Sequence, residues 1–216
     1  DSRGVIYTGS SGGDIFRIDK DDRIHKVVDQ DSTGFINTYR FYEDNNGWHW
    51  WGYKNGMTVY LPDYDRAVHY DTKRKLSFSG LGVSAFAHVG ADFYIGTYWN
   101  DLWKTDYTKL QASILASVNT GDAMDWAEIE IERNNGPIAK VTRDIEYMNV
   151  MADSLLVVRT NNYLWNMSPS SAQRKSTNDG FACDVANFFS GNHQEGIVIG
   201  TINGWCIYYP FSETES

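Results

Sequence analysis

The sequence is poor in proline and cysteine, has no long apolar run, and carries no excess of positive charge. Only 4 Pro and 2 Cys occur among 216 residues. No apolar run approaches the roughly 20 residues that span a membrane, so neither a membrane span nor a signal peptide is expected. With 19 Lys and Arg against 28 Asp and Glu, the formal charge is −9. This argues against a nucleic-acid partner, because a phosphate backbone is bound by basic surfaces.

Sequence motifs for metal, nucleotide or covalent chemistry are also lacking. Two cysteines, Cys183 and Cys206, cannot form a zinc tetrad, and the five histidines are scattered without metal-ligand spacing. No glycine-rich phosphate loop is present. We therefore expect no metal and no cofactor. The redox state of the two cysteines stays open.

Aromatic residues, in contrast, are abundant. They make up 15% of the chain, with 8 Trp, 14 Tyr and 10 Phe. This load, together with an apolar share of 42%, excludes a disordered chain and allows a substantial core. The chain starts without Met, as expected for a processed product or a piece of a longer polypeptide, and residues 212–216 form a polar tail.

A strand–turn–strand pattern recurs five times along the chain. Each copy has a short apolar strand, a small residue, a polar turn and a second apolar strand, which is the signature of a β-hairpin. Equivalent positions 9, 52, 96, 159 and 200 are separated by 43, 44, 63 and 41 residues. The predicted hairpins span residues 5–18, 48–60, 93–104, 156–166 and 197–208.

Alternating segments flank these hairpins and predict further strands. Segments at 35–41, 83–89, 145–150 and 181–186 precede a hairpin, whereas 24–28, 67–70 and 112–115 follow one. No stretch carries a convincing helical stripe. Four strands per 40–45 residues is the spacing of a β-propeller blade. We expect an all-β propeller, a single domain over residues 1–211, with five blades near 5–30, 34–76, 82–117, 140–175 and 181–210.

The blade hairpins resemble the two-component-regulator propeller repeat. The similarity lies in an acidic pair, a glycine turn, a Trp-containing strand, Gly-Thr and Asn-Gly, as in residues 43–56, 94–97 and 199–204. Tyr53 replaces Thr in the second copy and Arg159 replaces Gly in the fourth. The resemblance implies a propeller fold and leaves the function open, because related repeats serve many roles.

The ring of blades is predicted to be incomplete at its seam. No strand is recognisable before the first hairpin, and none after the fifth. Neighbouring sequence or another subunit would then supply strands. We expect a five-bladed ring, with an arc of a larger propeller as the alternative.

The turns after the second strands hold the candidate ligand-binding residues. Loops at one rim of a propeller carry function, and aromatic rings beside amide and carboxylate groups suit a sugar or a peptide. The alternative is that Trp99 folds back between the blades. The candidates are Tyr53, Lys54, Asn55, Tyr98, Trp99, Asn100 and Asp101.

An acidic insertion at residues 118–138 separates the third and fourth repeats. In its sequence Glu128, Glu130 and Glu132 alternate with isoleucines, so on a strand the three acids share one face. They could form a projecting arm for assembly or cation binding. The competing interpretation is a solvated edge protected by its charge.

The sequence therefore favours a non-enzymatic binding or scaffolding module that recognises a glycan or a peptide through rim loops. An extracytoplasmic, secreted or virion location is favoured. One alternative is a structural component of a larger assembly, such as a phage tail or virion protein, and the oligomeric state stays open. A five-bladed glycoside hydrolase ranks last, because the residues expected on the inner strands are mostly apolar. Asp184 and Glu146 are the acids that could face the channel, and we favour their being solvated residues.

Overall fold

The computed structural model is built mainly from antiparallel strands, with two helices in the part of the chain that it describes. From residue 151 onward only the backbone is described. The described residues are 1–71, 82–98, 102–122, 124, 129–133, 145–151, 155–160, 163–168, 171–175, 186–192, 196–201 and 204–208.

The described strands form five antiparallel sheets, each made of strands that are consecutive in the sequence. The first sheet contains β1 (Ile6–Gly9), β2 (Ile15–Ile18) and β3 (Ile24–Val28). The second contains β4 (Thr38–Glu43), β5 (His49–Tyr53), β6 (Gly56–Leu61) and β7 (Arg66–Asp71). Helix α1 (Gln30–Thr33) connects these two sheets.

The remaining sheets follow the same order of strands. The third contains β8 (Val83–Val89), β9 (Asp92–Thr97), β10 (Leu102–Asp106) and β11 (Glu132–Arg133), with helix α2 (Tyr107–Thr120) between its last two strands. The fourth contains β12 (Ile145–Met151), β13 (Leu155–Thr160), β14 (Tyr163–Ser168) and β15 (Ser171–Lys175). The fifth contains β16 (Ala186–Asn192), β17 (Gly196–Thr201) and β18 (Gly204–Tyr208).

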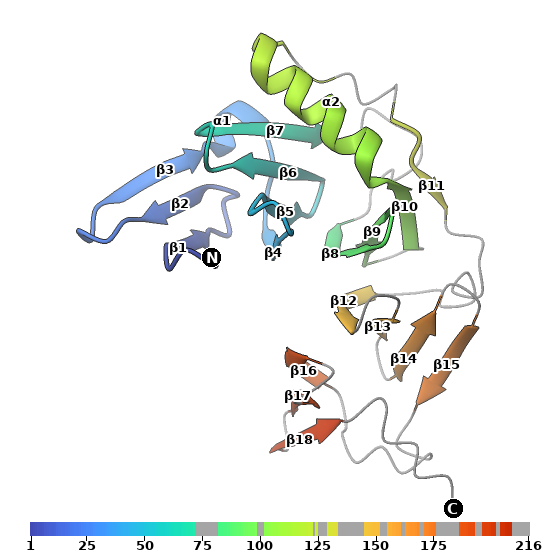
Figure 1. Ribbon diagram of the computed structural model, residues 1–216. Coiled ribbons are helices and arrows are strands. Elements are labelled where there is room, and N and C mark those ends of the chain that lie inside the picture. Colours follow the sequence, from blue (N-terminus) through green and yellow to red (C-terminus); the bar gives the residue numbers. More distant parts are fainter. Residues whose placement is uncertain are drawn as a thin grey trace, which may run out of the picture.

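The five sheets follow one another along an open arc (Figure 1). Strand β4 contacts β8, β8 contacts β12, and β12 contacts β16, so the first strands of successive sheets lie along the inner side of the arc. The two three-stranded sheets stand at its ends. The prediction of a propeller-like, mostly β chain is confirmed. Among the described residues no sheet closes the ring, so the five-bladed ring stays a prediction.

The hairpins predicted from the repeat all form. Gly9 pairs with Ile15 in the first sheet, and the equivalent Gly52 and Gly96 pair with Met57 and Leu102. The glycine is required by close packing. A Cβ at Gly52 would lie 2.2 Å from the carbonyl oxygen of Val83, on the next sheet. The repeated glycine thus lets neighbouring sheets approach each other.

Helix α2 corrects two predictions. Residues 112–115, predicted as a strand, lie inside this helix, and the extra chain between the third and fourth repeats begins at Tyr107 rather than at residue 118. Leu110 and Ile114 are buried beside Tyr107, and this spacing is helical. The Asp106 carboxylate accepts from the Lys109 amide at the start, and Gly121 ends the helix with φ 77°.

One predicted strand is displaced toward the C-terminus. The segment predicted at 35–41 becomes β4 at Thr38–Glu43, because Asn37 adopts a left-handed φ of 54° and breaks the extended backbone. Of the segment predicted at 181–186, residues 181–185 lie outside the described residues, and Ala186 begins β16. Cys183 lies outside the described residues, and Cys206 lies in β18.

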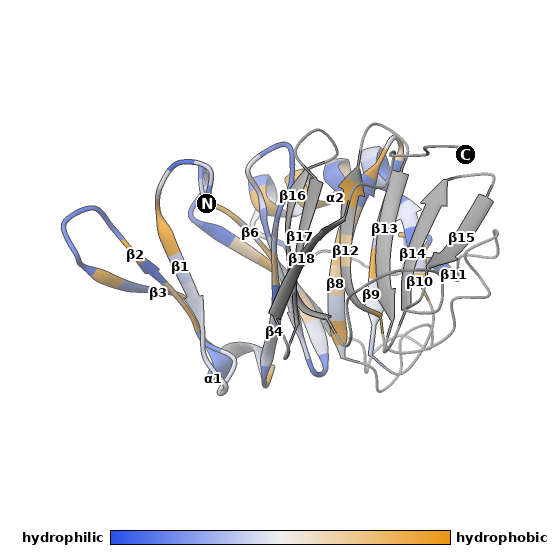
Figure 2. Ribbon diagram, turned by 90° about the horizontal axis from the view of Figure 1, so that it is seen from below, coloured by the Kyte–Doolittle hydropathy of each residue, from blue (hydrophilic) through white to orange (hydrophobic). Residues whose placement is uncertain are grey.

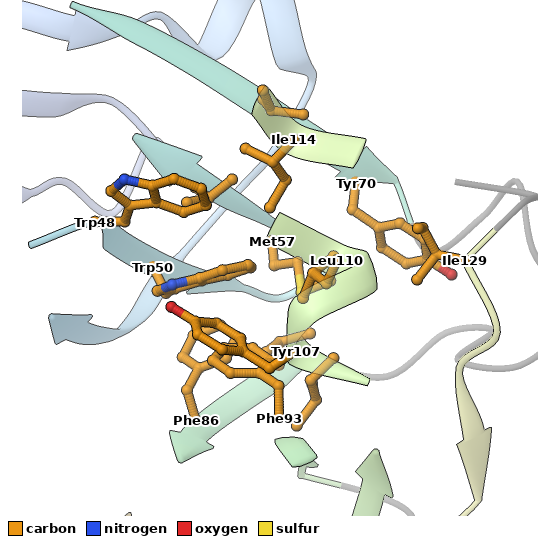
Figure 3. Close-up of a cluster of buried hydrophobic side chains, with 14 of the residues drawn as sticks. Trp48, Trp50, Met57, Tyr70, Phe86, Phe93, Tyr107, Leu110, Ile114 and Ile129 are labelled. Carbon is orange, nitrogen blue, oxygen red and sulfur yellow. The ribbon is translucent and has the colours of Figure 1, made fainter. Parts of the chain in front are cut away.

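The largest core cluster lies between the second and third sheets and under α2 (Figure 3). Trp50 and Phe93 are fully buried, with ring centroids 4.4 Å apart. Phe86 lies 6.0 Å from each of them. Leu110 and Ile114 of α2 cover this cluster. Aromatic packing between sheets accounts for much of the aromatic content.

A buried carboxylate links this core to α2. Asp44 is only 5% exposed. It accepts hydrogen bonds from the amides of Asn46 (2.9 Å) and Trp48 (3.0 Å), the Trp50 indole nitrogen (2.8 Å) and the Tyr107 hydroxyl (2.6 Å). Four donors offset the desolvation of this charge. Asp44, the second residue of the acidic pair in the repeat motif, is therefore structural here.

Candidate functional site

Because the strands are antiparallel, their turns lie on two opposite rims of the arc. We name them the hairpin rim, with the turns at 10–14 and 54–55 and the end of β9 at Thr97, and the notch rim, with the turns at 19–23, 44–48 and 62–65. Figure 2 shows α1 at the hairpin rim and the hydrophilic β2–β3 turn at the opposite one. Of the ligand-binding residues predicted from the sequence, Tyr53, Lys54, Asn55 and Tyr98 lie at the hairpin rim.

Tyr53 corrects one of those predictions, because it is fully buried. Its ring packs 4.9 Å from the ring of Phe35, in the connection between the first two sheets. That connection crosses the end of the second sheet and covers Tyr53. The ring therefore presents no face to a ligand, as expected if it had folded back into the core.

Asn55 serves to hold the same connection. Its side-chain oxygen accepts from the Ile36 amide at 3.1 Å, and its side-chain nitrogen donates to the Gly34 carbonyl at 3.0 Å. The Lys54 amide donates to the Ile36 carbonyl at 3.0 Å, while its side chain is exposed. Of these two neighbours, Lys54 is the one with its side chain open to solvent.

The third-repeat candidates are described only in part. Tyr98 is half-buried, its ring lies 4.9 Å from that of Tyr39, and its amide donates to the Gly82 carbonyl at 3.0 Å. Trp99, Asn100 and Asp101 lie outside the described residues. Their role in ligand binding stays a prediction.

The predicted acidic arm is partly an edge strand of the third sheet. Glu132 lies in β11, pairs with Lys104 of β10, and forms an ion pair with its Nζ at 3.4 Å. Glu130 is exposed and lies at a depression of about 250 Å³ near the start of α2. Glu128 lies outside the described residues. An assembly role for these acids stays a prediction.

A larger concavity lies at the notch rim, between the first and second sheets, and we name it the notch. Its volume is about 450 Å³, within the range of small-molecule sites. Val5, Tyr7 and Pro62 supply apolar surface. The charged lining comes from Arg3, Arg17, Asp19, Lys20 and Asp21.

The cations of the notch differ in how far they are already paired. Arg3 forms an ion pair of 2.8 Å with Asp63. Arg17 has long contacts, 3.5 Å to the Tyr60 hydroxyl and 4.0 Å to Asp65, and a side-chain hydrogen bond to Tyr7. In the described part of the chain, the side chain of Lys20 has no hydrogen-bond or ion-pair partner. The notch therefore holds hydrogen-bond donors that the protein itself does not fully use.

The turn beside the notch is held in one shape by Asp19. Its carboxylate accepts from the amides of Asp21 and Arg23, both at 2.9 Å, and contacts the His25 ring at 3.0 Å. The hydrogen bond from Arg23, together with His25, holds the pKa of Asp19 below its ordinary value. Asp22 takes a left-handed φ of 59° within the same turn. These contacts pre-organise the neighbouring Lys20 and Asp21.

A buried histidine lies behind the notch. His49 is fully buried, and its ring packs edge-on against Tyr7 at 4.4 Å. Burial lowers the pKa of His49 to about 4, outweighing the nearby Glu43, which acts in the opposite direction. The imidazole is therefore neutral at pH 7. Tyr7 is held against this ring on one side and lines the notch on the other.

Sequence reasoning missed the notch residues. Tyr7 and Arg17 lie directly opposite each other on β1 and β2, and the predicted first hairpin already implied that pairing. What the sequence did not show was that Pro62, from the next sheet, closes the space above them. In the described residues no group of three or more His, Cys, Asp or Glu could hold a metal.

No family model and no curated protein matches this sequence. Solved structures do resemble it. The extracellular domain of the hybrid two component system BT3049 from B. thetaiotaomicron matches with TM-score 0.66 and 17% identity, over 96% of this chain and 28% of that chain. PorZ, a surface component of the type-IX secretion system of Porphyromonas gingivalis, matches with TM-score 0.62 and 11% identity, over 97% and 31%. A streptogramin B lyase matches with TM-score 0.58 and 12% identity, over 96% and 66%.

These similarities show the fold alone. The chain has the propeller-type architecture of two-component-regulator extracellular domains, which confirms the resemblance seen in its repeat. It spans about a quarter of the length of those domains and two thirds of the lyase. Neither helix in the described residues has the length and apolar character needed to cross a membrane.

Proposed function

We propose that the chain is a non-enzymatic recognition module that binds a glycan or a peptide at a rim of its sheets, in an extracytoplasmic setting. The observation that carries this proposal is the notch, a preformed concavity with side-chain donors left unused. Its Asp19 carboxylate is held by three donors, which makes it a poor general acid or base. Extracellular domains and a surface component among the similar structures support the setting.

A ligand screen tests this function. We expect members of a combined glycan and peptide panel to raise the melting temperature of the protein, because a ligand that binds only the folded state stabilises it. Chromatography of the same mixtures should show unchanged ligands. Cleavage of a bound ligand would instead favour an enzyme, an alternative kept open by the similarity to a lyase and by the hydrolase prediction.

We further propose that the five sheets are five blades of a ring whose seam is incomplete. The first sheet starts at the second-strand position, and the fifth sheet has no fourth strand among the described residues. Added strands at both ends would complete the two blades. A measured structure showing sheets between β16–β18 and β1–β3 would instead make the chain an arc of a larger ring.

A structural role in a larger assembly is the second candidate, and one repeat position favours it. Three residues occupy the same position in their repeats, each three residues before the repeated glycine. They are Ile6, His49 and Phe93. His49 and Phe93 are fully buried against the preceding sheet, whereas Ile6 is 62% exposed and Ile24, on the same face, is 68% exposed. Large exposed apolar residues that are clustered mark interaction sites.

Native mass spectrometry tests this second candidate. Assembly through the outer face of the first sheet predicts oligomers of the wild-type chain that Ile6→Asp with Ile24→Asp dissociates. A wild-type chain that is only monomeric at micromolar concentration would refute self-assembly. Among the three similar structures described above none is a virion component, so they lend no support to a virion location.

A further inference from the structure

We propose that the notch binds a neutral saccharide. This proposal rests on the proposed recognition function and specifies the class of ligand and the site where it binds. The site combines three features. It has unused donors, unused acceptors and an apolar floor, all on one rim and between two sheets. A sugar is a ligand whose hydroxyls both donate and accept hydrogen bonds and whose ring presents an apolar face.

The donors come from β2 and from the turn that follows it. The Arg17 guanidinium carries five N–H donors. Its contacts with Tyr60 and Asp65 are long, and it also makes a side-chain hydrogen bond to Tyr7, so part of its donor capacity remains for a ligand. Lys20 is exposed at the lip of the notch and has no partner among the described residues. Two adjacent sugar hydroxyls can accept from such a pair without displacing any internal hydrogen bond.

The acceptors come from the turns on both sides of the notch. The Asp21 carboxylate lines the notch and has no side-chain partner among the described residues. Asp65, in the turn after β6, is 74% exposed and accepts from the Tyr60 hydroxyl at 2.7 Å. A carboxylate accepts several hydrogen bonds at once. Both side chains therefore keep acceptor capacity for hydroxyl donors.

The apolar floor is rigid. Tyr7 is fixed by its edge-on contact with the buried His49 ring and by a second contact with Tyr60, whose ring lies 6.1 Å away. Val5 and Pro62 extend this surface on either side. Binding on a preformed surface needs little ordering of the protein, which preserves affinity.

Charge balance favours a neutral ligand over an anion. The positive charges of Arg3, Arg17 and Lys20 are matched by lining carboxylates of Asp19 and Asp21 and by Asp63 paired with Arg3. An anionic ligand would meet these carboxylates as well as the cations. An extended peptide binds mainly through main-chain hydrogen bonds to a strand edge, whereas the groups described above are side chains on a sheet face.

The test begins with an array of neutral and acidic oligosaccharides and peptides, followed by calorimetry with the neutral oligosaccharide that binds best. We expect Arg17→Met to weaken that binding at least tenfold, because it removes the donors and keeps the aliphatic stem. Arg66→Met makes the same chemical change at an exposed residue at the start of β7 and should leave the affinity within about twofold, as a surface control. Lys20→Ala, in an exposed turn, repeats the test without touching a packed residue.

Salt separates the ligand classes. Raising the salt from about 0.1 M to about 1 M shortens the Debye length from roughly 10 Å to roughly 3 Å, so binding of a neutral sugar should change less than about twofold. An acidic saccharide or a peptide as the best ligand, with loss on Arg17→Met, would overturn the neutral-saccharide proposal. If Lys54→Met abolishes binding and Arg17→Met leaves it intact, the notch is ruled out as the binding site, whereas the recognition function is still supported. A panel without any binder would overturn both.

Discussion

Two neighbouring interfaces between sheets are formed by residues at the same repeat positions, but one interface is apolar and fully buried and the other is more polar and partly open. Between the second and third sheets, Trp50 faces Phe93, and both are fully buried in an apolar cluster. Between the first and second sheets, the equivalent positions are Tyr7 and His49, and Tyr7 is only half-buried. The first interface maximises aromatic burial. The second gives up part of that burial, opens into the notch, and holds the polar groups to which we assign recognition.

The largest expected effect comes from truncating the aromatic of the apolar interface. Trp50→Ala should lower the free energy of unfolding by about 3–5 kcal/mol, because it leaves a cavity and removes a donor to Asp44. Tyr7→Ala, at the matching position, should lower it by about half as much, since its ring is partly exposed. Urea denaturation of both variants measures the difference. Equal losses would mean that the two interfaces are packed alike.

Acid should weaken the interface that contains His49. The folded-state pKa is lowered to about 4 from an ordinary value of 6.5, so below pH 6.5 the unfolded chain takes up the proton first. The stability that neutral His49 contributes is therefore full above about pH 6.5, is lost as the pH drops to about 4, and changes no further below it. A shift of this size corresponds to about 3 kcal/mol.

His49→Phe places the residue of the equivalent third-sheet position into this interface. It should remove about half of the stability lost between pH 7 and pH 4, because burial also lowers the pKa of His69 to about 4 and that histidine remains. Denaturant titrations across this pH range provide the measurement. An unchanged pH dependence in the variant would show that His49 titrates normally.

The two rims should respond differently to the loss of a polar group. Asn55→Ala on the hairpin rim should lower the free energy of unfolding by about 0.5–1 kcal/mol, because it removes two hydrogen bonds, to the Ile36 amide and the Gly34 carbonyl, whose groups water can reach. Saccharide affinity should stay within about twofold. Thermal unfolding and calorimetry on the same variant check both parts. A loss of saccharide binding with unchanged stability would instead indicate that the binding site lies on the hairpin rim.

The smallest effect is expected on the outer face of the first sheet. Ile6→Ala should change the free energy of unfolding of the monomer by no more than about 0.5 kcal/mol, since Ile6 is 62% exposed. Phe93→Ala, at the same repeat position, should cost about 3–5 kcal/mol. Chemical denaturation of dilute protein compares them. A large loss for Ile6→Ala would show that this face is already covered by another sheet.

Local patterns in the sequence predicted the strands well and the connections poorly. The hairpins around Gly9, Gly52 and Gly96 could be recognised because alternation and a tight approach between sheets leave a local signature. The strand predicted at 112–115 was wrong because a window of four residues is too short to distinguish a strand period of two from a helical period of 3.6. The helical evidence lay outside that window, in the cap residues Asp106 and Gly121.

The site was harder to predict because it depends on how separate repeats stack. Tyr53 was predicted to bind a ligand at the rim, and only the path of the chain through Phe35 shows that its ring is covered. Tyr7 and Arg17 belong to no distinctive motif. They line the candidate site together with Pro62, which comes from the next sheet. Hydrogen bonds such as those of Asp19 likewise need coordinates.

Hydrogen exchange with and without the saccharide that binds best tests recognition at the notch most directly. The account predicts slower amide exchange within residues 5–9 and 15–23 of the first sheet, with no change at residues 53–55 on the hairpin rim. The Arg17→Met variant should lose that protection at the same saccharide concentration. Protection confined to residues 53–55, or equal protection in the variant, would contradict recognition at the notch.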